Sequence, residues 1–136
     1  MAFSAHLVFD GQCEKAFQFY AECFGAKIIS MMKWNQTPAA DQAPPGAGDR
    51  IVHATMNASG TYVFGADAFP GKYEKPQGFF VLFSVNDSEQ AERIFNKLAD
   101  GGTIDMPMQE TFWAARYGVV RDRFGIPWEI NCSKQH

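Results

Sequence analysis

The sequence predicts an α+β fold built from two similar modules, each with the order strand–helix–strand–strand–strand. One observation is that two segments have the periodicity of an amphipathic helix, each preceded by one short apolar segment and followed by three. The other is that a shift of 75 positions matches the two halves, placing Leu7 on Leu82 and Ala16 on Ala91. Neither half could cover both faces of a four-stranded sheet. We therefore expect the modules to form a cup-shaped mixed sheet with both helices on its outer face.

The first module covers about residues 1–67. Residues 3–9 are expected to form a short apolar strand that is broken at Gly11. Residues 12–24 carry apolar side chains at i, i+3/i+4 and i+7, which is typical of an amphipathic helix, and Gly25 is suited to end it. Three further strands are expected at residues 27–34, 51–57 and 61–66.

The second module covers about residues 78–136 and repeats this order. Residues 78–86 form an apolar strand, and Asp87 or Ser88 can cap a helix at 88–100. Three strands are expected to follow, at residues 103–106, 113–121 and 127–132.

Two loops rich in proline and glycine interrupt these modules, at residues 35–50 and 67–77. The first is long for a connection inside a compact domain, which makes it a candidate for a mobile flap. We expect both loops to shape any pocket.

Composition excludes several classes of function. The chain has 136 residues, of which 46% are hydrophobic and 20% charged, with a net charge of −3. Nucleic acid is not an expected partner, because binding to its backbone needs a basic surface. A membrane is not expected either, since no apolar run approaches the ~20 residues needed to cross one. The three cysteines are odd in number and far apart, so they do not form a disulfide framework, which favours a cytoplasmic location.

Two segments carry a resemblance to a known family, LVFDGQCEKAFQFYAECFGAKI near the start and QETFWAARYGVVRDRFGIPWEIN near the end. The chain resembles the vicinal-oxygen-chelate superfamily of glyoxalase, bleomycin-resistance and dioxygenase proteins, and most closely its PhnB-like branch. The resemblance implies a single domain of paired βαβββ modules, a small-molecule cavity in the cup and a homodimer. Some PhnB-like proteins carry a methyltransferase label, but the sequence lacks the Gly-rich loop after a strand that would hold S-adenosylmethionine.

The resemblance also raises the question of a metal. In metal-dependent members, four ligands point into the cup from the first and last strands of each module. The matching positions here are Ala5, Phe64, Phe80 and Glu129, and only Glu129 can bind a metal. His6 is one residue from the first position and would face inward only through a bulge; otherwise we expect it beneath the helices. We expect no complete metal site and no other cofactor. The alternative is a partial site in which His6 and Glu129 hold Zn²⁺, Ni²⁺, Mn²⁺ or Fe²⁺.

Glu129 is the most informative of these residues. It lies in a strand that should be buried on at least one face, where a carboxylate must be paired, hydrogen-bonded or bound to metal. One interpretation is an ion pair with Arg116, Arg121 or Arg123. The other is a catalytic or ligating role in the cavity, with Glu129 as a general base or a metal ligand.

Aromatic residues can either fill the core or line a cavity for a flat ligand. The candidates are Trp34, Phe80, Phe112, Trp113, Tyr117 and Trp128. Arg116 can anchor an anionic ligand, or lie at the surface. The residues expected to line the ligand cavity are Ala5, Phe64, Phe80, Trp113, Arg116 and Glu129.

Two functional classes follow from these residues. The first is a protein that binds a small, partly apolar molecule without a complete metal site, and it is favoured by the apolar residues at three ligand positions. The second is a lyase, isomerase or dioxygenase that acts on a vicinal-oxygen substrate through Glu129. A dimeric protein without any ligand is a weaker third class.

Overall fold

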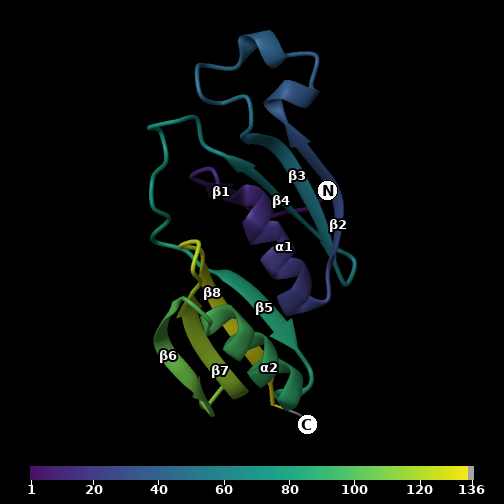
Figure 1. The fold of residues 1–136 in the computed structure, drawn as a ribbon. Coiled ribbons are helices and arrows are strands. Elements are labelled where there is room, and N and C mark those ends of the chain that lie inside the picture. Colours follow the sequence, from purple (N-terminus) through teal and green to yellow (C-terminus); the bar gives the residue numbers. More distant parts are fainter. Residues whose placement is uncertain (135–136) are drawn as a thin grey trace. The chain divides into compact units, whose positions relative to one another are not determined.

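The computed structural model describes residues 1–134, and the chain divides into two compact units after Glu74. The first unit carries β1 (His6–Phe9), α1 (Cys13–Phe24), β2 (Lys27–Lys33), β3 (Ile51–Ala58) and β4 (Thr61–Asp67) (Figure 1). The second unit carries β5 (Val81–Val85), α2 (Ser88–Ala99), β6 (Thr103–Gln109), β7 (Ala114–Arg121) and β8 (Pro127–Ser133). The predicted order of one strand, one helix and three strands is confirmed in both units.

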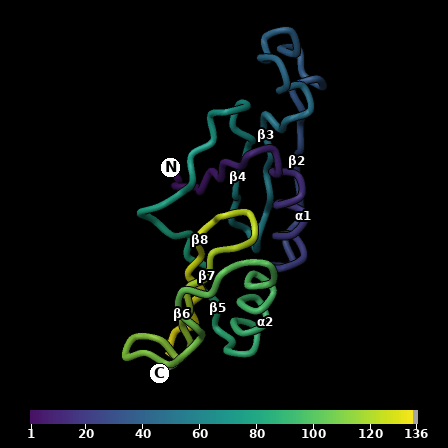
Figure 2. Tube along the Cα trace, turned by 60° about the vertical axis from the view of Figure 1, so that its left-hand side comes forward, coloured from purple at the N-terminus to yellow at the C-terminus, as the bar shows by residue number. Residues whose placement is uncertain are grey.

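The two units have the same topology. The strand orders are β1-β4-β3-β2 and β5-β8-β7-β6, so each sheet has four strands. In each, the first strand pairs in parallel with the last, and the remaining pairs are antiparallel. Figure 2 shows each helix along one side of the strands of its own unit. This repeated arrangement agrees with the internal match found at a shift of 75 positions. A cup formed jointly by the two sheets stays an expectation from the family.

The core of the first unit lies between α1 and its sheet. Leu7 and Phe9 of β1 are buried, and the ring of Phe9 meets that of Phe17 of α1 edge-on with centroids 6.3 Å apart. The alternate residues His6 and Val8 are exposed. Because successive side chains of a strand point to opposite faces, His6 and Val8 lie on the face that points away from α1. We call the face of each sheet that points away from its helix the open face.

The second unit is packed in the same manner. Val120 and Ile130 are completely buried beneath α2. A Cβ atom at Gly118 would lie only 2.7 Å from Cε2 of Phe95, so β7 approaches α2 closely because this position has no side chain. The buried stripe of α2 consists of Ala91, Ile94, Phe95 and Leu98, as the helical periodicity predicts.

Each helix begins where an aspartate accepts a main-chain N–H. Asp87 caps α2 by accepting the N–H of Glu89 at 3.2 Å. The carboxylate that serves α1 comes from the end of β4, since Asp67 accepts the N–H of Cys13 at 2.9 Å. Its second oxygen accepts the N–H of Ile51 at 2.8 Å, so Asp67 ties the starts of α1 and β3 together.

The structure differs from the sequence predictions mainly at strand ends. Strand β1 begins at His6 rather than residue 3, and Phe3 is fully exposed. Strand β5 is shorter than predicted, and β6 is longer. Strand β6 includes Pro107, which is tolerated because β6 is an edge strand whose pairing is irregular between Met106 and Gln109. Two short 3-10 helices occur around the 35–50 loop, Trp34–Gln36 at its start and Ala40–Gln42 within it.

Within residues 1–134 the two α-helices have 12 residues each, and no helix has the length and apolar character that crossing a bilayer would require.

Candidate functional site

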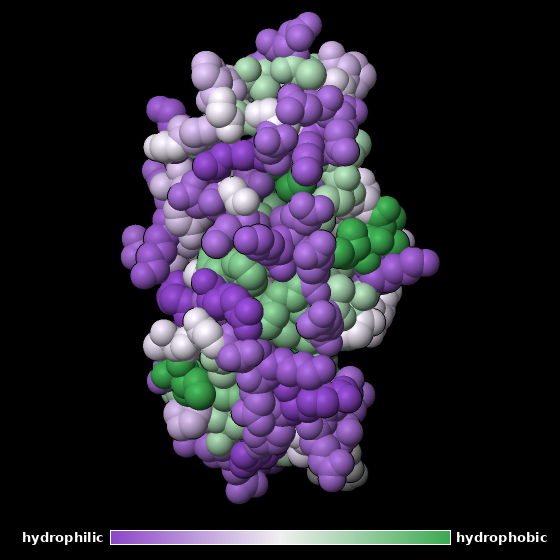
Figure 3. Space-filling model, in the orientation of Figure 1, coloured by the Kyte–Doolittle hydropathy of each residue, from purple (hydrophilic) through white to green (hydrophobic). Residues whose placement is uncertain are grey.

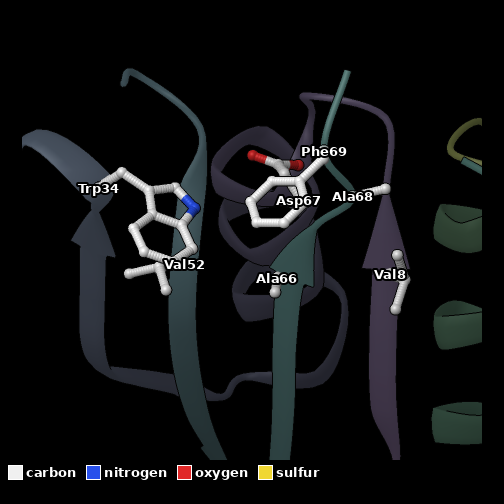
Figure 4. Close-up of a pocket in the computed structure, with 7 residues that line it drawn as sticks. All are labelled: Val8, Trp34, Val52, Ala66, Asp67, Ala68 and Phe69. Carbon is white, nitrogen blue, oxygen red and sulfur yellow. The ribbon is translucent and has the colours of Figure 1, made fainter. Parts of the chain in front are cut away.

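The open face of the first sheet contains a hollow of about 300 Å³ (Figure 4). Figure 4 shows Val8, Val52 and Ala66 on three neighbouring strands in front of α1, with the rings of Trp34 and Phe69 beside them. The two ring centroids are 5.7 Å apart. The residues that line the hollow are Val8, Trp34, Val52, Ala66, Asp67, Ala68 and Phe69.

Local chain geometry brings these apolar side chains together. Val8 and Ala66 alternate with buried neighbours in β1 and β4, so both face away from α1. The register of β3 shifts beside Val52, because Met32 pairs with His53 while Lys33 pairs with Ile51. An extra residue in one strand changes the direction in which a side chain points, and here the side chain of Val52 lies on the open face.

Asp67 lines the hollow but is committed to the fold. It is 9% exposed, and its two oxygens accept the main-chain N–H groups described above. Because both oxygens already accept hydrogen bonds, the carboxylate stabilises the main chain next to Val52 and is not available to bind a ligand.

Phe64 lies on the open face of the first sheet but is not among the residues that line the hollow. It is in register with His6 on β1 and with Thr55 on β3. Its ring centroid is 6.1 Å from that of His53, and Nε2 of His53 is 2.9 Å from Oγ1 of Thr55. The centre of this face thus combines one phenyl ring with two imidazoles and a hydroxyl.

The expectation that His6 packs beneath the helix is wrong. The buried residues of β1 are Leu7 and Phe9, which places His6 on the open face without any bulge. Ala5 precedes β1 and is in phase with Leu7 and Phe9, so strand alternation assigns the open face to His6 rather than Ala5. The family position that we matched to Ala5 is therefore displaced by one residue.

Glu129 lies on the open face of the second sheet, in register with Leu82 of β5 and Val119 of β7. Its carboxylate accepts a hydrogen bond from the hydroxyl of Tyr117. Burial, together with this hydrogen bond and the charge of Glu129, raises the pKa of Tyr117 to about 12. The ring of Trp113 meets that of Tyr117 edge-on, with centroids 5.3 Å apart.

The ion pair expected between Glu129 and an arginine is wrong, because all three arginines have other partners. Arg116 donates from Nε to Glu92 of α2 at 2.7 Å. Arg121 donates from Nη1 to two main-chain carbonyl oxygens at 3.1 and 3.2 Å. Arg123 pairs with Asp100 at 3.1 Å.

Arg116 therefore does not belong to a ligand cavity on the open face, and this expectation is corrected. It is in phase with Gly118 and Val120, which face α2, and its partner Cys132 in β8 is buried near Ser88 of α2. A two-residue period thus turns Arg116 toward the helix, while Tyr117 faces the opposite side.

The aromatic candidates divide between surface and core. Phe80 and Trp113 are 48% and 50% exposed, so the core-packing alternative is wrong for both. Trp128 is buried, and its indole N–H donates to Asp122 at 2.9 Å. Trp34 and Phe69 both line the hollow, but only Trp34 is among the aromatic candidates from the sequence. The position of Phe69 in a loop directly after a strand was a signal that could have identified it.

Neither unit by itself offers the donor set of a metal centre held by four protein side chains. Within residues 1–134, no group of three or more His, Cys, Asp and Glu side chains of one unit converges. A structural zinc site takes four protein ligands and a catalytic one takes three. The open faces offer His6 and His53 in one unit and Glu129 in the other.

Comparisons with known proteins agree with the fold. A family model described as Glyoxalase/Bleomycin resistance protein/Dioxygenase superfamily matches residues 4–130. Protein YjdN of Escherichia coli (strain K12) is 34% identical over 143 aligned positions, covering 99% of this chain and 97% of YjdN. The crystal structure of PA1353 from Pseudomonas aeruginosa superposes with a TM-score of 0.91 at 33% identity, covering 99% of both chains.

A further solved structure is the PhnB protein from Bacillus cereus, with a TM-score of 0.81, 23% identity and coverage of 98% of this chain and 100% of that one. That protein is described as a putative 3-demethylubiquinone-9 3-methyltransferase. At 23% identity the structural similarity shows only that the two chains share a fold. The family match spans almost the whole sequence. The chain therefore belongs to the Glyoxalase/Bleomycin resistance protein/Dioxygenase superfamily.

Proposed function

We propose that the protein binds a small, partly apolar molecule on the open face of its sheet, without a complete metal site. The observation that carries this proposal is the hollow beside Trp34 and Phe69. Its volume of about 300 Å³ lies at the lower end of the range of roughly 300–1,000 Å³ typical of ligand pockets. An apolar floor with two ring walls suits a flat ligand, since rings favour offset or edge-on contacts.

The residues at the family's ligand positions support the same function. Phe64 and Phe80 replace two of the four donors with hydrocarbon, whereas His6 and Glu129 stand at the other two. Half of the side chains that would hold a metal are thus exchanged for groups that contact an apolar ligand.

A panel of small aromatic compounds tests this proposal, with binding measured by thermal shift and by tryptophan fluorescence. Ala66→Leu would place an isobutyl group in the hollow, so we expect it to abolish binding of the best compound with little change in melting temperature. The matched control is Thr61→Leu, which adds a similar apolar group at an exposed position of the same strand. Equal binding by both variants, or no binding by the unaltered chain, would refute the proposal.

A second candidate function is catalysis by Glu129 on a vicinal-oxygen substrate. The observation that favours it is the hydrogen bond from Tyr117, because a hydroxyl and a carboxylate in contact can supply and accept a proton. We expect Glu129→Gln and Tyr117→Phe each to reduce any turnover found, while circular dichroism stays unchanged. Turnover that survives Glu129→Gln rules this candidate out.

We also propose that two copies of the chain associate. Apolar side chains reach the surface in several places (Figure 3), and Phe3, Tyr62 and Phe79 are among the exposed large ones. Burying such residues against a second copy would remove apolar area from water. We expect light scattering at micromolar concentration to give twice the monomer mass, and the monomer mass would contradict this proposal.

We place the protein in the cytoplasm, on the basis of its three widely spaced cysteines, which form no disulfide framework in the sequence. Cell fractionation checks this location.

A further inference from the structure

The open face of the second sheet carries a carboxylate whose charge is not paired. Within residues 1–134, Glu129 accepts a hydrogen bond from Tyr117, and none of the ion pairs includes it. An ionised carboxylate has about four lone-pair positions for hydrogen bonds. One donor therefore leaves most of the acceptor capacity of Glu129, and all of its charge, for another group.

The neighbouring arginines do not supply that group. Arg116 faces α2, and Arg123 pairs with Asp100 beyond the end of the sheet. Arg121 shares the open face, but its Nη1 is held by the carbonyl oxygens of Gly125 and of the loop before β5. The negative charge of Glu129 is thus not matched by any of these three arginines.

Further aromatic rings adjoin Tyr117, which donates the hydrogen bond to this carboxylate. Trp113 contacts Tyr117 edge-on at 5.3 Å, and Phe112 contacts Trp113 edge-on at 4.7 Å. Trp113 is half exposed, so part of its ring is open to a ligand. Leu82 is in register with Glu129 and is also exposed, which adds an apolar surface on the other side. Rings attract a cation placed over their faces, and a carboxylate attracts it by charge.

We propose that Glu129, Tyr117 and Trp113 form a binding site for a small organic cation, a protonated amine or a quaternary ammonium that carries apolar substituents. The carboxylate neutralises the cation, the rings contact its alkyl groups, and Leu82 packs against its apolar part. The hydrogen bond from Tyr117 orients the carboxylate. This inference goes beyond the binding function proposed above, because it does not require the hollow of the first unit to bind anything. It shares Glu129 and Tyr117 with the catalytic candidate but requires no turnover, so a binding measurement tests it separately.

Isothermal titration of the full, unaltered chain provides the first test. The probe is benzyltrimethylammonium, compared with neutral benzyl alcohol and anionic benzoate, which share its ring. We expect the cation to bind at least about tenfold more tightly than either comparator, because only the cation gains from both the carboxylate and the rings. Added salt should weaken this binding. Equal affinity for the three probes would overturn the proposal, and this comparison needs no variant.

Two substitutions locate the site. Glu129→Gln retains an acceptor for Tyr117 but removes the charge, and we expect it to weaken binding of benzyltrimethylammonium about tenfold. Trp113→Leu should weaken it about threefold. The matched control is Glu89→Gln, which removes the same charge from an exposed position of α2 and should leave binding unchanged. Unchanged binding by Glu129→Gln, or an equal loss in Glu89→Gln, would refute the assignment. Ala66→Leu, which fills the hollow of the first unit, should leave cation binding intact, so the two proposals fail separately.

Discussion

Replacing Asp67 by asparagine tests whether one carboxylate holds the first unit in the shape that forms the hollow. Its oxygens accept the N–H groups of Cys13 and Ile51 at 2.9 and 2.8 Å, and the residue is 9% exposed. Asparagine keeps one acceptor and turns an NH₂ group toward the other N–H. The variant therefore loses one charge-assisted hydrogen bond and leaves a buried donor unsatisfied. We expect it to lower the free energy of unfolding by about 2–4 kcal/mol.

Urea denaturation followed by circular dichroism measures this loss. The matched control is Asp10→Asn, because Asp10 is exposed and forms a surface ion pair with Arg50 at 3.1 Å. Such pairs contribute at most about 1 kcal/mol, so Asp10→Asn should change stability little. A loss below about 1 kcal/mol for Asp67→Asn, or equal losses in the two variants, would show that the main-chain contacts of Asp67 do not stabilise the fold as argued.

Three further predictions concern the second unit. Tyr117 should titrate near its raised pKa of about 12 in ultraviolet absorbance, and Glu129→Gln should lower that pKa by replacing the charged acceptor of its hydrogen bond with a neutral one. The unfolded chain releases this proton first, near pH 10. The stability that Tyr117 contributes is therefore complete below pH 10 and is lost as the pH rises toward 12. A pKa of Tyr117 close to 10 in the folded protein would contradict this prediction. Gly118→Ala should cost about 1–3 kcal/mol in urea denaturation, because its Cβ would lie 2.7 Å from Phe95, and Phe95→Leu in the same chain should recover part of the loss. Arg116→Gln should cost less than about 1 kcal/mol, since its ion pair with α2 is partly exposed, and a larger loss would show a structural role that the geometry does not indicate.

Both α-helices were predictable from the sequence because several signals agree for each. The apolar stripe of the first helix is followed by Gly25, which adopts the left-handed conformation with φ of 65°. The stripe of the second is preceded by Asp87, which does cap it. Strand ends were less predictable. Phe3 is apolar, like the buried residues of β1, so its residue type does not show that the strand begins only at His6.

The faces of the strands limited the prediction of the site. A shift of one residue exchanges the two faces, so matching the family positions without gaps placed Ala5 where the structure has His6. The same sensitivity led us to expect Arg116 in the cavity, although its neighbour Tyr117 occupies the open face. The contact between Tyr117 and Glu129 depends on the register of β7 and β8. That register is fixed by a turn whose geometry the spacing of residues does not determine.

The parallel pairing within each unit also constrains how the chain is made. Strand β1 is synthesised before its hydrogen-bonding partner β4, which ends at Asp67. The first sheet thus remains incomplete until Asp67 has left the exit tunnel. Until then α1 also lacks the carboxylate that accepts the N–H of Cys13 at its start. Pairing two strands that are so far apart in sequence is slow, because the chain loses conformational entropy before the stabilising contacts between them form. During synthesis the apolar face of α1 therefore depends on β2 and β3 for cover until the last strand arrives.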